Sequence, residues 1–182
     1  DQDNPKKVAM VLEDMSNLTI DGQGANLYMN GRMLPIAMVN CENCTIKNLS
    51  IDTRIPQITQ IVVVENNQKE GTITYRVTPD TKYKIDADGR FITYGDNWDV
   101  HPVAGIAFDG NTGHILYQTS DIAVGTNNVV EVEPYLIKAP WQNQKLKEGT
   151  IVALRNYARP TPGIFMSGNK NTSLCDVTVH YA

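Results

Sequence analysis

The stretch Cys41-Glu-Asn-Cys-Thr-Ile-Lys-Asn-Leu-Ser-Ile-Asp52 carries the strongest fold signal in the chain, because two other segments repeat its pattern. One copy is Met15-Ser-Asn-Leu-Thr-Ile-Asp-Gly22, and the other is Asn169-Lys-Asn-Thr-Ser-Leu-Cys-Asp-Val-Thr-Val-His180. Each contains Asn, one further residue, Thr or Ser, and then Ile or Leu. Asn17 and Asn43 are 26 residues apart, about one coil of a parallel β-solenoid. The repeat therefore predicts stacked parallel strands.

The third copy predicts an inserted domain. Asn171 follows Asn43 by 128 residues, so about 102 residues remain once one coil of 26 is removed. Helical periodicity is nearly absent, so we expect an all-β fold. We expect parallel β-helix coils over residues 1–59, an inserted antiparallel β-barrel or sandwich over 60–156, and a return to the β-helix over 157–182.

The predicted insertion contains short runs of β-branched and aromatic residues separated by turn signals, which is typical of an antiparallel barrel or sandwich. The predicted strands are Gln60–Glu65, Thr72–Thr78, Lys82–Ile85, Phe91–Tyr94, Ile106–Phe108, His114–Gln118, Val129–Val132, Tyr135–Ile137 and Thr150–Leu154.

Aligned repeats also predict columns of side chains. Ile20, Ile46 and Leu174 should form one inward column, and the aligned Asn residues should hydrogen-bond in a ladder. Leu49 and Val177 lie three residues further on, at the opposite parity. This slip predicts a bend between two short strands in each coil.

The composition narrows the classes of partner. The 182 residues have a formal net charge of −4 and show no basic stripe, so we do not expect nucleic acid binding. The longest apolar run, Ile61–Val64, is far shorter than the ~20 residues of a membrane span. Cys41 and Cys44 are spaced as metal ligands can be, but paired partners are missing, and free buried thiols are the favoured interpretation. We expect no metal and no cofactor.

The columns suggest a binding surface. Asp52 follows Ile46 by six residues and His180 follows Leu174 by six, so both should occupy one column just past the strand. Stacked coils often form an extended binding groove, although solvated edge residues would give the same pattern. Arg159, which precedes Pro160, is a further candidate at the domain junction.

Motifs for catalysis and for other ligands are few in this sequence. Trp98 and Trp141 are either platforms for a sugar or parts of the core of the insertion. No nucleophile elbow, phosphate loop or dinucleotide motif is present. Most carboxylates of the insertion lie in turns, where Asp bonds the backbone, so no pair is placed for sugar hydrolysis.

Several segments together resemble the α-1,3-galactosidases of glycoside hydrolase family 110. They are Gly31-Arg-Met-Leu-Pro-Ile-Ala37, Cys44-Thr-Ile-Lys-Asn-Leu-Ser-Ile-Asp52, Thr119-Ser-Asp-Ile-Ala-Val-Gly125, Arg159-Pro-Thr-Pro-Gly-Ile-Phe-Met-Ser167, Asn171-Thr-Ser-Leu174 and Val179-His-Tyr-Ala182. The resemblance implies a secreted or periplasmic bacterial enzyme with a right-handed β-helix that carries β-barrel domains. It implies removal of terminal α-1,3-linked galactose from glycans with inversion, without a cofactor.

The resemblance also implies that the catalytic aspartates belong to later coils, in a motif of consecutive Asp residues that this sequence lacks. We therefore expect an N-terminal fragment whose catalytic carboxylates lie beyond Ala182 and which is inactive alone. Asp52, Arg159, His180 and Tyr181 are the expected substrate-binding residues. Two alternatives stay open: a lyase-type β-helix that uses Ca²⁺, and a non-catalytic solenoid that binds glycans.

Overall fold

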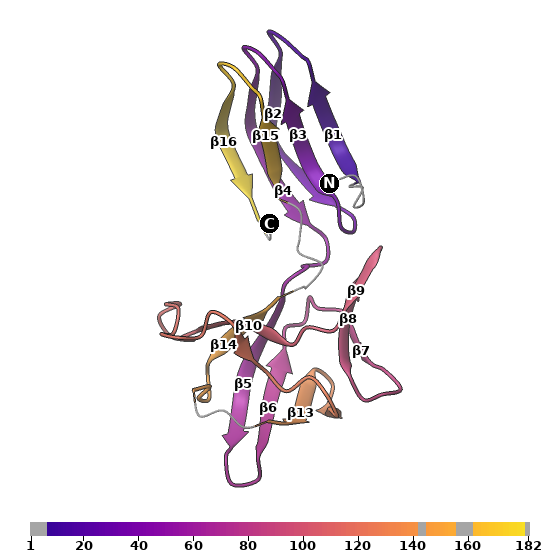
Figure 1. Cartoon of the computed structure of the whole chain (residues 1–182), viewed down its shortest axis with the longest axis vertical. Coiled ribbons are helices and arrows are strands. Elements are labelled where there is room, and N and C mark those ends of the chain that lie inside the picture. Colours follow the sequence, from indigo (N-terminus) through magenta and orange to yellow (C-terminus); the bar gives the residue numbers. More distant parts are fainter. Residues whose placement is uncertain (1–6, 142–144, 156–161, 181–182) are drawn as a thin grey trace. The chain divides into compact units, whose positions relative to one another are not determined.

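The computed structural model describes residues 7–141, 145–155 and 162–180 (Figure 1). The regular elements within these ranges are all β-strands. No helix in them is long and apolar enough to cross a membrane. The chain divides into two compact units, the first formed by Asp1–Arg54 with Pro160–Ala182 and the second by Ile55–Arg159.

The first unit contains two parallel three-stranded sheets, and neighbouring strands come from successive passes of the chain (Figure 1). One sheet, in the order β1-β3-β15, consists of β1 (Val8–Glu13), β3 (Leu34–Val39) and β15 (Ile164–Ser167). The other, in the order β16-β4-β2, consists of β2 (Thr19–Met29), β4 (Thr45–Thr53) and β16 (Ser173–Val179).

The register of the second sheet is the one that the repeat predicts. Ile46 is the parallel partner of Ile20 on one side and of Leu174 on the other. The predicted Asn ladder is also present, because Asn43 donates from Nδ2 to Oδ1 of Asn17 at 3.3 Å and Asn171 donates to Asn43 at 2.6 Å. Both predictions are confirmed.

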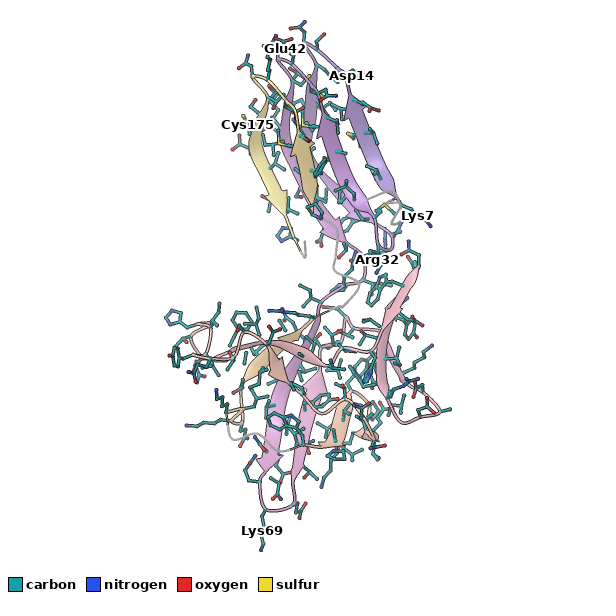
Figure 2. The ribbon with its side chains drawn as sticks, viewed as in Figure 1. Lys7, Asp14, Arg32, Glu42, Lys69 and Cys175 are labelled. Atoms are coloured by element: carbon teal, nitrogen blue, oxygen red, sulfur yellow. The ribbon has the colours of Figure 1, made fainter. Side chains whose placement is uncertain are left out.

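The ladder residues also shape the turns between the two sheets. Asn17, Asn43 and Asn171 have positive φ angles of 56°, 54° and 46°. Asn tolerates this left-handed conformation better than most residues, which gives a backbone reason for its recurrence. Glu42 lies in the same turn region, and Figure 2 shows it at the same end of the unit as Asp14.

The inward column is only partly buried. Ile46 is fully buried and packs with Met38, Cys41 and Cys44, while Ile20 packs partly buried against them. Leu174, however, is 40% exposed, because β16 is the edge strand of its sheet and is covered on one side only. Its register with Ile46 confirms that Leu174 belongs to the predicted column, and the column is less buried here because nothing described covers the free side of β16.

The parity slip has a different structural basis from the predicted bend between two strands. β4 is one continuous strand, and the slip is taken up at Asn48, which has a φ of 56°. The equivalent residue of β16, Asp176, has a φ of 51°. A single residue with left-handed backbone thus reverses which face the following side chains point to, without ending the strand.

The second unit is antiparallel throughout its described strands. Its seven-stranded sheet, in the order β11-β10-β14-β5-β6-β13-β12, consists of β5 (Thr59–Asn67), β6 (Thr72–Val77), β10 (Ala104–Phe108), β11 (Ile122–Ala123), β12 (Val130–Glu133), β13 (Leu136–Pro140) and β14 (Ile151–Leu154). A three-stranded sheet consists of β7 (Tyr83–Ile85), β8 (Phe91–Gly95) and β9 (Trp98–Val100).

The core of the second unit forms around Tyr75 and Phe91, whose ring centroids are 6.0 Å apart in an edge-to-face arrangement. Burial raises the pKa of the Tyr75 phenol, whose Oη donates to the carbonyl of Gly125 at 3.1 Å. The seven-stranded order ends at β11 and β12, so strand pairing among the described residues does not close this sheet.

Most predicted strands of the insertion are present, with two kinds of error. The predicted strand His114–Gln118 is wrong, since this segment makes only an isolated bridge between Ile115 and Phe108. Leu116 in it packs against the core, but Tyr117 is 87% exposed, so only part of the segment is held by packing. The short strands β9 and β11 were not predicted.

Candidate functional site

The outer face of the β16-β4-β2 sheet holds the candidate site. Leu49 and Ile51 of β4 are buried, whereas Ser50 and Asp52 between and after them are partly exposed. This alternation follows from the pleat, which sends successive side chains to opposite faces. Polar residues on the outer face therefore line up across the three strands.

The left-handed residues of these strands interrupt the face at one level. Asn48 and Asp176 lie opposite each other between the pairs Lys47–Cys175 and Leu49–Val177. In β2 the register shifts between Asp21 and Ala25, where Gln23 and Gly24 have φ angles of 52° and 82°. Three neighbouring strands thus depart from regular pleating side by side.

Gly22 allows β2 to approach β4 closely at this level. A Cβ on Gly22 would lie 2.5 Å from the Cβ of Leu49 and 2.7 Å from the carbonyl oxygen of Asn48. Any larger residue would push the strands apart. Gly24 differs, because nothing lies within 4 Å of a Cβ built there, and only its positive φ favours glycine.

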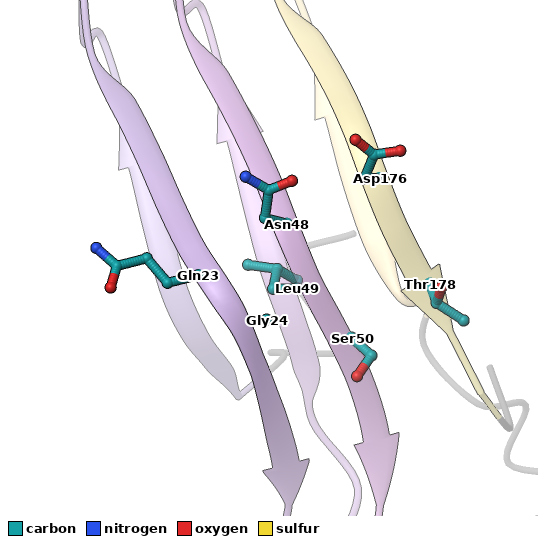
Figure 3. Close-up of a pocket in the computed structure, with 7 residues that line it drawn as sticks. All are labelled: Gln23, Gly24, Asn48, Leu49, Ser50, Asp176 and Thr178. Atoms are coloured by element: carbon teal, nitrogen blue, oxygen red, sulfur yellow. The ribbon is translucent and has the colours of Figure 1, made fainter.

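The interruption forms a shallow groove of about 450 Å³, which we call the outer groove (Figure 3). Its lining residues are Gln23, Gly24, Asn48, Leu49, Ser50, Asp176 and Thr178. The lining thus combines amide, carboxylate and hydroxyl side chains with the buried Leu49. Such a mixture can donate to and accept from a hydroxyl-rich ligand.

The charged groups around the groove differ in how they are held. Asp21 accepts hydrogen bonds from Asn48 Nδ2 at 2.9 Å and from the Gln23 N–H at 3.0 Å, and it pairs with Lys47 at 3.3 Å. The Asn48 amide, with the Gln23 N–H, holds the pKa of the Asp21 carboxyl below its ordinary value. Asp176 is exposed, and its carboxylate makes no hydrogen bond or ion pair within the described part of the chain.

The predicted column of Asp52 and His180 is confirmed as a register. Val179 is the partner of Ile51, and the His180 N–H donates to the Ile51 carbonyl at 2.8 Å, so His180 comes beside Asp52. On the other side, Asp52 is the partner of Tyr28. A role of these residues in binding stays a prediction.

Tyr28 was missed by the sequence reasoning, although it completes the column on the β2 side. Its side chain is 51% exposed, and the guanidinium of Arg54 lies 5.8 Å from its ring centroid. Because β2 carries extra residues between Asp21 and Ala25, counting from the repeat does not place Tyr28 opposite Asp52. We call Tyr28, Asp52 and His180 the Tyr28 row.

The other candidates do not join this surface. Arg159 and Tyr181 lie outside the described residues. Trp98 is buried in the second unit and Trp141 packs partly buried against its core, which confirms the core interpretation of both tryptophans.

The cysteines do not pair with one another. Cys41 and Cys44 are buried free thiols, and Cys175 is exposed. The Cys41 thiol lies 3.4 Å from the Leu12 carbonyl, and the Cys44 thiol lies 3.5 Å from that of Met15, so each contacts the preceding chain pass. In the described ranges, no three His, Cys, Asp or Glu residues are grouped so that they could hold a metal ion.

The fold and surface together define an all-β protein in which an antiparallel unit interrupts a stack of parallel strands. Residues 59–152 match the family described as GLAA-B beta-barrel domain I, and the chain belongs to this family.

Known relatives agree with this assignment. The chain is 51% identical over 183 residues to Alpha-1,3-galactosidase B of Bacteroides fragilis, covering 100% of this chain and 31% of the relative. It is 47% identical to the protein of the same name from Parabacteroides distasonis, covering 100% of this chain and 30% of the relative. The corresponding protein of Akkermansia muciniphila is 32% identical over 95% of this chain and 22% of the relative. The chain thus spans about a third or less of the length of these curated relatives.

Proposed function

We propose that this chain is part of an α-1,3-galactosidase, a glycoside hydrolase that removes terminal α-1,3-linked galactose from glycans. The observation that carries the proposal is the 51% identity to Alpha-1,3-galactosidase B over the whole chain. The family match over residues 59–152 agrees with it, since it covers most of the antiparallel unit. Secretion or a periplasmic location stays a prediction.

We further propose that the two parallel sheets are coils of a right-handed β-helix. Support comes from the 26-residue step between Asn17 and Asn43, and from the parallel pairing of β4 with both β2 and β16. Stacked coils of this kind present one continuous outer surface, which suits an extended glycan.

In the proposed enzyme the outer groove and the Tyr28 row contact the sugar. Asp52 accepts the Thr53 N–H at 2.7 Å through one oxygen, which fixes its carboxylate and leaves the second oxygen for a ligand hydroxyl. His180, exposed next to it, can donate or accept at a neighbouring hydroxyl. The ring of Tyr28 offers an apolar face beside these polar groups.

Inversion requires two carboxyl groups about 6.5–9.5 Å apart, one that protonates the leaving oxygen and one that activates water. A general acid of this type needs a raised pKa. By contrast, hydrogen bonds from the Asn48 amide lower the pKa of Asp21, and those from the Arg90 and Thr112 backbones lower the pKa values of Asp86 and Asp109. None of these three carboxyls therefore has the raised pKa that a general acid needs.

The test compares the 182-residue chain with the full-length protein of the relatives' kind that contains it. Both are incubated with α-1,3-galactobiose, and galactose release is followed by proton NMR. We expect the full-length protein to release β-galactose first, and the 182-residue chain to release none. Initial release of α-galactose would reject inversion. Turnover by the 182-residue chain would place the catalytic pair within it, and the absence of turnover by the full-length protein would reject the galactosidase proposal.

A further inference from the structure

A second pocket is lined only by residues of the antiparallel unit and shares no residue with the outer groove. Its volume is about 720 Å³, within the usual range for small-molecule sites. Its walls include Tyr83 and Lys84 of β7, Tyr94 of β8, Glu131 of β12, and Tyr135 from the loop between β12 and β13. We call it the tyrosine pocket.

The backbone at Tyr135 is unusual for an aromatic residue. β12 and β13 are joined by the two residues Pro134 and Tyr135, and Tyr135 has a φ of 64°. When Pro comes first in a tight turn, the next position with positive φ is usually filled by Gly or Asn. A bulky residue there is strained, and such strain persists where surrounding contacts impose it.

Those contacts hold the loop in place. The Tyr135 N–H donates to Oη of Tyr83 at 2.8 Å and to Oε1 of Glu131 at 3.2 Å. The Tyr83 hydroxyl in turn donates to the same Glu131 oxygen. Burial, and then the hydrogen bond to Glu131, raise the pKa of Tyr83 to about 12, so its phenol remains a neutral donor.

The Tyr135 ring is anchored but not covered. Its centroid lies 5.4 Å from that of Tyr83, which lies 5.4 Å from that of the buried Phe91. The contacting rings of Phe91, Tyr83 and Tyr135 thus lead from the core to the edge of the pocket, where Tyr135 is 38% exposed. Tyr94, on the rim as well, is 37% exposed and has Lys84 Nζ 5.9 Å from its ring centroid.

The chemistry of the pocket selects the class of ligand. Two acidic side chains, Asp80 and Glu131, are balanced by two basic ones, Lys82 and Lys84, so the walls favour neither an anion nor a cation. Exposed, fixed tyrosine rings can stack against the C–H face of a pyranose. The carboxylate and ammonium groups beside them can bond to its hydroxyls. An uncharged oligosaccharide fits this combination.

We propose that the tyrosine pocket is a non-catalytic glycan-binding site that holds a neutral sugar unit through Tyr135 and Tyr94. The choice of a galactose-terminated glycan as its ligand rests on the proposed function. Binding at this site needs no turnover, however, so it can be tested separately.

The test titrates the ¹⁵N-labelled 182-residue chain with α-1,3-galactobiose and follows amide shifts. We expect saturable shifts at residues that line the pocket. The key variant is Tyr135→Gly, which removes the ring, keeps the backbone N–H and suits the positive φ, so the fold should be retained. It should weaken binding at the pocket about tenfold or more. Tyr117→Ala removes a tyrosine that is 87% exposed outside the pocket, and it should bind as the wild type does.

Each outcome bears on one proposal. Pocket shifts that persist unchanged in Tyr135→Gly, or no pocket shifts at all, would overturn the glycan site even if the full-length protein is a galactosidase. Pocket binding that is lost in Tyr135→Gly, together with a full-length protein that hydrolyses nothing, would retain the site and reject the proposed function.

Discussion

The side-chain amide of Asn171 donates to Oδ1 of Asn43 at 2.6 Å, although 128 residues separate the two in the sequence. Asn43 donates to Asn17 in the same way, so each rung uses one donor and one acceptor of an amide. The ladder therefore fixes the register of three chain passes at their turns. It also explains why the same residue type recurs at all three positions.

Replacing Asn43 separates its two roles, which are the side-chain hydrogen bonds of the ladder and the left-handed backbone at the turn. Asn43→Gly should cost about 0.5–1.5 kcal/mol of unfolding free energy through lost hydrogen bonds. Asn43→Ala should cost about 1–2 kcal/mol more, because its φ of 54° disfavours a Cβ without a polar group. Urea unfolding of both variants, followed by far-UV circular dichroism, measures the difference. Equal costs would show that the left-handed backbone is not what selects Asn here.

Ile46 and Leu174 form a matched pair, because they are partners in register but differ in burial. In the 182-residue chain, Ile46→Ala should destabilise the first unit by about 2–5 kcal/mol, since it leaves a cavity at a fully buried site. Leu174→Ala should cost clearly less. Hydrogen exchange of β4 amides measures both, and a cost for Leu174→Ala as large as that for Ile46→Ala would contradict the edge position of β16.

Tryptophan fluorescence of the same variants, followed in urea, provides a control from the second unit. Both tryptophans, Trp98 and Trp141, belong to the second unit. Their fluorescence should therefore show an unchanged unfolding transition in Ile46→Ala. A shift of that transition equal to the loss in the first unit would mean that the two units unfold as one.

The Tyr28 row predicts a kinetic effect in the full-length protein. His180→Ala should lower kcat/KM for α-1,3-galactobiose about tenfold, because one hydrogen bond to the substrate is lost, while the melting temperature changes little. Cys175→Ala, at an exposed position within β16, is the control and should keep wild-type kinetics. Wild-type kinetics for His180→Ala as well would remove this residue from the proposed sugar surface.

Tyr83 predicts an alkaline loss of stability in the second unit. The unfolded chain ionises this phenol near pH 10, whereas the folded unit keeps it neutral to about pH 12. Its contribution is thus complete below pH 10 and falls as the pH rises toward 12. In Tyr83→Phe, urea midpoints from tryptophan fluorescence should fall less over this range than in the wild type. Tyr117→Phe, at an exposed position, should match the wild type, and an unchanged slope in Tyr83→Phe would contradict the raised pKa.

The sequence predicted the contacts that depend on repetition and missed those that depend on packing. The Asn spacing located Ile20, Ile46 and Leu174 in one register because each coil repeats the same backbone path. The kink at Asn48 was interpreted as a bend between strands, since side-chain parity cannot distinguish a turn from one left-handed residue.

The tyrosine pocket could not be predicted for a different reason. Tyr83 and Tyr135 are 52 residues apart, and their contact depends on how the β12–β13 hairpin packs against β7. No repeat encodes that pairing. Similarly, the segment His114–Gln118 was predicted as a strand from its β-branched and aromatic residues, but it pairs with β10 only in the isolated bridge between Ile115 and Phe108. Residue types alone carry no information about how far such a pairing extends.

The pairing of Thr59 with Leu154 joins the first and last strands of the antiparallel unit. It has a consequence for the order of folding. If β16 had to find β4 across an open chain, it would close a loop of 128 residues. Once β5 and β14 have paired, only roughly 30 flexible residues remain in that loop. At about 0.6 kcal/mol per doubling, this lowers the entropic cost of closure by about 1.2 kcal/mol. On a ribosome, where β16 emerges after β5 and β14, the antiparallel unit can be complete before β16 pairs with β4, and it then holds the two ends of the parallel stack close together.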